Sequence, residues 1–185
     1  ALMPSAPSDG PPAAPLPLRV HPSERGPAGL SVSASLAPVG SDDGPGWLLR
    51  YRLDGDIDAL AIPSPAAGAA DGLWRHTCLE AFVQDGDGPG YHEFNFSPSG
   101  QWAVYRFSAE RVRDTAAESA SAAMCLPPPS VTWHRTPEVL VLEAWLPLLA
   151  LHVSGSGQPL DLGLTAVIET RDQTLSYWAL RHPGA

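Results

Sequence analysis

The sequence contains no lysine, and its 11 basic residues, all arginines, face 20 acidic ones. The formal net charge of -9 at pH 7 would repel a phosphate backbone, so we expect no nucleic-acid partner. The chain also lacks a run of about 18 apolar residues that could span a bilayer as a helix. It has no basic start followed by an apolar core, the pattern of a secretory signal. These absences predict a cytoplasmic protein that does not insert into a membrane.

Cysteine is scarce, with only Cys78 and Cys125, and their spacing matches no metal motif. Without an export signal we favour two reduced thiols, although the sequence leaves a disulfide open. The six histidines are scattered, and only His76 and His92 fall on neighbouring predicted strands. A metal site needs three or four converging ligands, and residues 85–88 (DGDG) lack the other ligands of a calcium loop. We therefore expect no metal site.

Long helices are disfavoured because the chain has 21 prolines and 17 glycines, which favour turns. Residues 1–15 are rich in Pro, Ala and Ser, and we expect a disordered tail there, followed by one domain over 16–185. Residues 108–123 could hold one or two helical turns. Strands are predicted, from alternation and turn signals, over 16–21, 30–36, 47–53, 74–83, 91–97, 101–107, 131–135, 139–146, 162–169 and 174–180.

About ten short strands with turns between them predict an all-β fold, an antiparallel β-sandwich of the immunoglobulin or jelly-roll kind, with at most one short helix. The best-defined hairpin joins the strands at 91–97 and 101–107. Pro98 presets φ at the second position of the turn Ser97-Pro98-Ser99-Gly100, and Gly100 occupies the fourth.

Side chains alternate across a strand, so parity assigns them to the two faces of a sheet. The strands at 74–83 and 91–97 each have one apolar face and one face of mixed character. The mixed face holds Trp74, His76, Glu80, Tyr91, Glu93 and Asn95. Aromatic rings beside carboxylates and an amide suit a sugar, whose ring stacks and whose hydroxyls form hydrogen bonds. The same pattern is typical of a solvated sheet face, and both interpretations stay open.

Three segments, LWRHTCLEAFV (73–83), YHEFNFSPSGQWAVYRF (91–107) and LSYWALRH (175–182), together resemble the bacterial DOMON-like domain proteins. This group lies within the DOMON and family 9 carbohydrate-binding-module superfamily. The resemblance covers roughly residues 16–182 and implies a β-sandwich that binds sugars or haem in its better-known branches. Sugar-binding relatives hold the ring between two tryptophans, and Trp74 and Trp178 occupy similar positions. Both could equally be core aromatics.

Haem-binding relatives use a Met and a His as axial ligands. Here Met3 lies in the predicted tail and Met124 precedes a proline run, so neither matches the motif, although His182 could reach a pocket. We expect no cofactor, with a haem-binding redox or electron-transfer module as an alternative function.

Catalysis is not indicated, because the sequence has no G-x-S-x-G, P-loop or dinucleotide motif. Glu80 and Glu93 could form an acid–base pair, or they could form structural hydrogen bonds and arginine contacts. We expect a non-catalytic module that binds a small ligand, a carbohydrate or a cell-wall precursor. A protein-interaction domain is the other alternative, and the ligand's identity and the oligomeric state stay open. The predicted ligand-binding residues are Trp74, His76, Glu80, Tyr91, Glu93, Asn95, Trp178 and Arg181.

Overall fold

The computed structural model describes residues 13–42, 44–85, 88–124, 126–147 and 160–182. Most of the predicted tail, together with Cys125 and His152, lies outside these ranges. The described strands are β1 (Leu16–Val20), β2 (Ser31–Ser41), β3 (Gly44–Asp54), β4 (Gly68–Ala69), β5 (Cys78–Asp85), β6 (Tyr91–Phe96), β7 (Gln101–Ala109), β8 (Val112–Arg113), β9 (Ser130–Arg135), β10 (Val139–Pro147), β11 (Leu160–Glu169) and β12 (Leu175–Ala179). All ten predicted strands are present, with shifted ends, and β4 and β8 are short additions.

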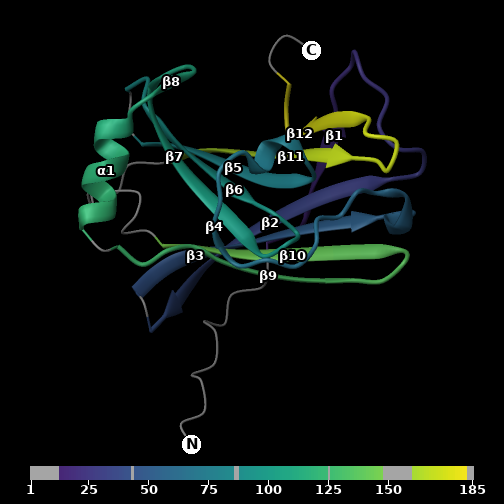
Figure 1. Cartoon of the computed structure of the whole chain (residues 1–185), viewed down its shortest axis with the longest axis horizontal. Helices are drawn as coiled ribbons and strands as arrows, with labels where there is room; N and C mark the ends of the chain where they lie inside the picture. Colours follow the sequence, from purple (N-terminus) through teal and green to yellow (C-terminus); the bar gives the residue numbers. More distant parts are fainter. Residues whose placement is uncertain (1–12, 43, 86–87, 125, 148–159, 183–185) are drawn as a thin grey trace, which may run out of the picture.

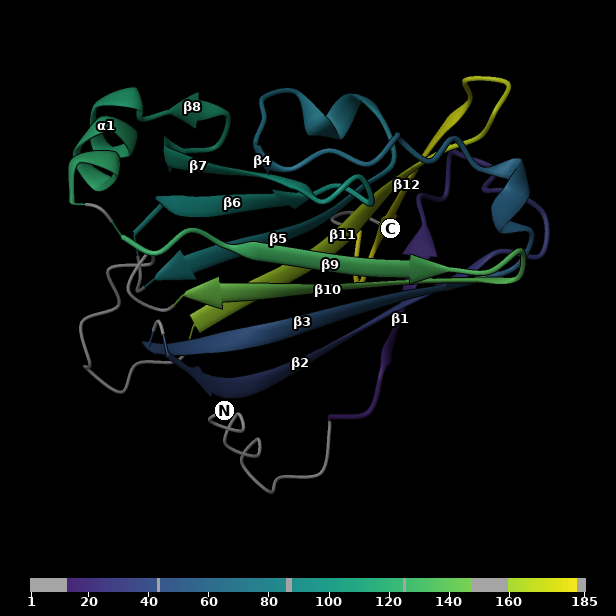
Figure 2. The same cartoon turned by 60° about the horizontal axis from the view of Figure 1, so that its bottom comes forward.

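The strands form one curled sheet in the order β4-β7-β6-β5-β11-β12-β1-β2-β3-β10-β9, with β8 beside β7. Strand β1 joins the two halves, because it pairs with β12 on one side and with β2 on the other. The halves face each other as a half-barrel that resembles a β-sandwich (Figures 1 and 2). The all-β, sandwich-like fold is therefore confirmed. The sheet is mixed rather than purely antiparallel, because β4 pairs with β7 in parallel.

The core lies between the two halves and follows the predicted parity. One half contributes Leu49, Tyr51 and Leu53 from β3 and Leu140, Leu142, Ala144 and Leu146 from β10; the other contributes Leu79, Ala81, Val83, Phe94, Phe96, Leu164, Ala166 and Ile168. The Tyr51 hydroxyl spans the core and donates a hydrogen bond to the Glu80 carbonyl oxygen at 2.6 Å. That bond satisfies a polar atom that burial would otherwise destabilise.

The hairpin between β6 and β7 forms as the turn residues predict. The Gly100 amide donates to the Ser97 carbonyl, and the Ser97 amide donates to the Gln101 carbonyl, both at 2.9 Å. Gly100 has φ of 104°, and a Cβ there would come within 2.8 Å of the Ala66 carbonyl oxygen. Glycine is thus required both by the backbone conformation and by the loop packed against it.

One short α-helix, α1 (Thr115–Ala123), follows β8 and lies beside β7 (Figure 1). The Asp114 side chain caps it by accepting a hydrogen bond from the Ala117 amide at 2.9 Å. Two 3-10 helices, η1 (Ile57–Ala59) and η2 (Leu73–Arg75), complete the described elements. None of the described helices is long and apolar enough to cross a membrane.

The strand predicted from Trp74 begins only at Cys78, and this boundary was wrong. Gly72, with φ of 75°, starts η2, in which the Arg75 and His76 amides donate to the Gly72 and Leu73 carbonyls at 3.2 Å. The glycine turn and its hydrogen bonds override the strand propensity of the residues that follow. Trp74 is therefore presented by a helical turn above the sheet.

Candidate functional site

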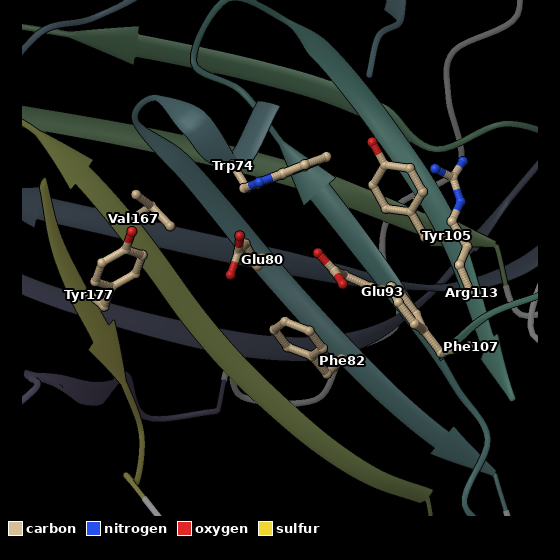
Figure 3. Close-up of a pocket in the computed structure, with 9 residues that line it drawn as sticks. All are labelled: Trp74, Glu80, Phe82, Glu93, Tyr105, Phe107, Arg113, Val167 and Tyr177. Atoms are coloured by element: carbon tan, nitrogen blue, oxygen red, sulfur yellow. The ribbon is translucent and has the colours of Figure 1, made fainter. Parts of the chain in front are cut away.

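A pocket of about 310 Å³ lies on the outer face of the sheet, the face of β5, β6, β7, β11 and β12 that points away from the core (Figure 3). Its lining residues are Trp74, Glu80, Phe82, Glu93, Tyr105, Phe107, Arg113, Val167 and Tyr177. Register brings several of these together: Phe82, Glu93 and Tyr105 stand side by side on β5, β6 and β7. Alternation therefore places a structural face and a pocket face on the same strands.

Glu80 lies at the bottom of the pocket and is only 8% exposed. Its Oε2 accepts a hydrogen bond from the Thr165 hydroxyl on β11 at 2.6 Å. Burial raises the pKa of Glu80 to about 7, with a further increase from the nearby Glu93 charge, while the Thr165 hydrogen bond works in the opposite direction. Near neutral pH this carboxyl therefore exists in both protonation states.

Glu93 is the second carboxylate in the pocket. Its Oε1 accepts a hydrogen bond from Asn95 Nδ2 at 3.2 Å. Burial raises the pKa of Glu93, and the Asn95 hydrogen bond and the Arg113 charge lower it by less. Asn95 is fully buried directly across from Glu80, and its Oδ1 finds no hydrogen-bond partner among the described residues. The floor of the pocket is therefore rich in acceptors.

Exposed aromatic rings stand above this floor. Trp74 is 38% exposed and Tyr177 is 46% exposed. Trp74 meets the Tyr105 ring edge-on, with centroids 5.8 Å apart. The loop that carries Trp74 is fixed by Tyr105, whose hydroxyl donates to the Asp71 carboxylate and accepts from the Gly72 amide at 3.3 Å. Burial and the Asp71 hydrogen bond hold the pKa of Tyr105 well above its usual value.

Arg113 on β8 forms one side of the rim. Its guanidinium lies 4.5 Å from the centroid of the Tyr105 ring, a cation–π arrangement. Its Nε donates to both carboxylate oxygens of Glu118 in α1, at 2.9 and 3.1 Å. Helix α1 therefore supplies the counter-ion of Arg113 and keeps the side chain over the aromatic wall.

Three of the residues predicted to bind ligand, Trp74, Glu80 and Glu93, line this pocket together. Asn95 lies beneath it and orients Glu93. Tyr91 lies next to it, stacked on the pocket residue Phe107 with ring centroids 4.7 Å apart.

The other three predicted residues lie elsewhere. His76 is exposed, and its Nδ1 lies 2.8 Å from Glu169 Oε2. Trp178 is 7% exposed on the core face of β12, with its Nε1 donating to the Ser176 hydroxyl at 2.9 Å. Arg181 lines a separate groove near β1. The structure thus does not bring Trp74 and Trp178 together around one cavity.

Sequence reasoning did not single out Phe82, Tyr105, Phe107, Arg113, Val167 and Tyr177. Strand parity could have found most of them, because Tyr105 and Phe107 share a face of β7, and Tyr177 has the opposite parity to Trp178. No sequence pattern indicated Arg113, because its position at the pocket depends on the two-residue strand β8 and on its contact with α1.

The described residues contain no group of three or more His, Cys, Asp or Glu side chains arranged to hold a metal ion. Cys78 is buried as a free thiol. For haem, Met124 is exposed at the end of α1, and the His182 Nε2 lies 2.7 Å from the Arg19 carbonyl oxygen. Neither side chain lines the pocket described above.

No protein-family model matches the chain, so the DOMON resemblance is not confirmed. No curated protein matches its sequence either. Among solved structures, the chain is similar to a protein of Bacteroides uniformis described as a "putative carbohydrate-binding protein". The TM-score is 0.65 at 19% sequence identity, and the match covers 93% of this chain and 78% of that one. The two proteins share a fold.

Proposed function

We propose that this protein binds a carbohydrate in the pocket above Glu80 and Glu93. The observation that carries the proposal is the combination of two exposed aromatic rings, Trp74 and Tyr177, with the carboxylates of the buried Glu80 and the half-buried Glu93 beneath them. A sugar ring has apolar faces that stack on aromatic side chains, and hydroxyl groups that donate to carboxylates. The pocket offers both kinds of contact within one cavity.

The dimensions of the pocket fit a small ligand. A cavity of about 310 Å³ is at the lower end of the range for ligand sites, which favours one or two sugar rings over an extended chain. The walls are held by contacts outside the cavity, such as those of Tyr105 with Asp71 and of Arg113 with Glu118. A pocket whose walls are already fixed loses little conformational entropy on binding.

The similar fold of the Bacteroides uniformis protein supports the same ligand class. This support is an analogy of fold, because one fold can carry different sites. The argument for carbohydrate therefore rests first on the side chains of the pocket.

The test is thermal unfolding of the full chain against a panel of soluble mono-, di- and trisaccharides, followed by calorimetric titration of any sugar that raises the midpoint. A ligand that binds only the folded state adds about 2.7 kcal/mol of stability at 100 times its dissociation constant. We expect at least one sugar to raise the midpoint. Tyr177→Ala should weaken its binding by about tenfold or more, because the exposed ring at the rim is removed.

Leu16→Ala is the matched control, because Leu16 is 53% exposed on β1 and does not line the pocket. This variant should bind the sugar as the wild type does. The proposal fails if no sugar of the panel shifts the midpoint, or if Tyr177→Ala and Leu16→Ala bind equally well.

A further inference from the structure

The two carboxylates of the pocket have no counter-ion among the described residues. The ion pairs among all the described residues are Arg50–Glu143, Arg52–Asp54, His76–Glu169 and Arg113–Glu118. None of them includes Glu80 or Glu93. A carboxylate that is buried, as Glu80 is, or half-buried, as Glu93 is, is costly unless it is paired, protonated or neutralised by a bound group. The pocket therefore has an excess of negative charge that a ligand could offset.

Arg113 does not remove this excess. Its Nε is engaged by both carboxylate oxygens of Glu118, so one positive charge already matches one negative charge. Arg113 lowers the pKa of Glu93, but burial raises it more. With Arg113 and Glu118 balancing each other, no positive charge among the described residues matches Glu93 and the ionised form of Glu80.

Hydrogen-bond donors are also scarce on the floor. Within the described part of the chain, Glu80 receives one donor, from Thr165, and Glu93 receives one, from Asn95. A second oxygen of each carboxylate has no donor among the described residues. A group with several N–H donors and a positive charge would fit these acceptors better than a single hydroxyl.

The aromatic walls favour the same chemistry. Trp74, Tyr105 and Tyr177 surround the two carboxylates together with Phe82 and Phe107 (Figure 3). The negative face of an aromatic ring attracts a cation, most strongly where water is displaced, and tryptophan does so best. Aromatic rings and carboxylates together are a recognition site for ammonium groups.

We infer that the pocket selects ligands that carry a protonated amine. Among sugars, this ligand is an amino sugar whose ammonium group lies between Glu80 and Glu93. This inference rests on the proposed function, because the sugar ring is assigned to the same exposed aromatic rings. It goes further by assigning the charge of the ligand to two named carboxylates.

The test compares three disaccharides of the same linkage by titration calorimetry at pH 7: the β-1,4-linked dimers of glucosamine, of N-acetylglucosamine and of glucose. We expect the glucosamine dimer to bind at least about tenfold more tightly than either neutral dimer, as a charge-assisted contact would give. Glu80→Gln and Glu93→Gln should each reduce this preference severalfold. Glutamine keeps the shape of the side chain, and in Glu80→Gln the amide oxygen can still accept the hydrogen bond from Thr165.

Glu143→Gln is the control, because Glu143 is a carboxylate on β10 outside the pocket, paired with Arg50 at 3.3 Å. It should leave the preference unchanged. If the glucose or N-acetylglucosamine dimer binds as tightly as the glucosamine dimer, the inference is overturned while the proposed function stands. If none of the three dimers binds the wild-type protein, the inference is overturned, and the proposed function fails as well only if no sugar of the thermal-unfolding panel binds. Because the comparison of ligands uses the wild type, it remains decisive even if a glutamine variant does not fold.

Discussion

Two tryptophans on opposite faces of the same half of the sheet differ in how far they are covered, and this difference separates a core residue from a proposed ligand-binding residue. Trp178 is 7% exposed on the core face, with its indole nitrogen bonded to Ser176, whereas Trp74 is 38% exposed above the outer face. The core face is covered by the other half of the sheet, and the outer face is not. An aromatic ring that is buried between the two halves stabilises the fold, whereas one that is exposed on the outer face is available to a ligand.

The largest expected effect comes from Trp178→Ala. Removing a buried tryptophan leaves a cavity and typically costs about 3–5 kcal/mol, and here the hydrogen bond to Ser176 is lost as well. The free energy of unfolding, measured by urea titration, should fall by about this amount. A loss of less than about 1 kcal/mol would show that Trp178 does not belong to the core, and the contrast between Trp178 and Trp74 would no longer hold.

The second-largest expected effect is a pH dependence of the free energy of unfolding that comes from Glu80. The folded protein holds the Glu80 proton up to about pH 7, whereas the unfolded chain releases it near the ordinary value of 4.5. Between these values folding takes up a proton, so the free energy of unfolding falls as pH rises through this window and levels off above it. The fall due to Glu80 amounts to roughly 3 kcal/mol, at about 1.36 kcal/mol per pKa unit.

Urea titrations of the wild type and of Glu80→Gln from pH 4 to pH 8 isolate this contribution, because the other titrating groups cancel in the difference. The glutamine variant should be about as stable as the wild type at pH 4 and more stable at pH 8. A difference that does not depend on pH would mean that Glu80 has the same pKa in the folded and the unfolded chain, so that its burial in the pocket does not raise the pKa.

A smaller effect is expected for Tyr51→Phe. The Tyr51 hydroxyl crosses the core to the Glu80 carbonyl oxygen, so its removal leaves a buried acceptor without that donor. The expected cost is about 1–2 kcal/mol in the free energy of unfolding. Tyr177→Phe removes a hydroxyl from an exposed ring and is the matched control. If both variants changed the free energy of unfolding equally, the distinction between the buried core face and the exposed outer face would not hold.

Much of the fold could be predicted from the sequence because its signals are local. Alternation placed the ten strands, and Pro98 and Gly100 identified the hairpin. Parity correctly separated Glu80 and Glu93 from Leu79 and the rest of the core-facing residues. The continuous curl of the sheet was not predictable, because it depends on β1 pairing with β12, which is far away in the sequence, as well as with its neighbour β2.

The site was predicted only in part for the same reason. Glu80 and Glu93 followed from parity, but Trp74 reaches the pocket through a 3-10 turn that begins at Gly72. The resemblance pointed to Trp178, whereas the neighbouring Tyr177 lines the pocket. Arg113 is placed by its partner Glu118 in α1, which no strand pattern can show.

The most direct test of the account is Trp74→Ala, with stability and sugar binding measured on the same sample. The ring is partly exposed and its main described contacts are the edge of Tyr105 and the Arg75 guanidinium, so the free energy of unfolding should change by about 1 kcal/mol or less. Binding of a sugar that stabilises the wild type should weaken by about a hundredfold. A variant that binds as the wild type does, or that loses several kcal/mol of stability, would contradict the assignment of Trp74 to a ligand.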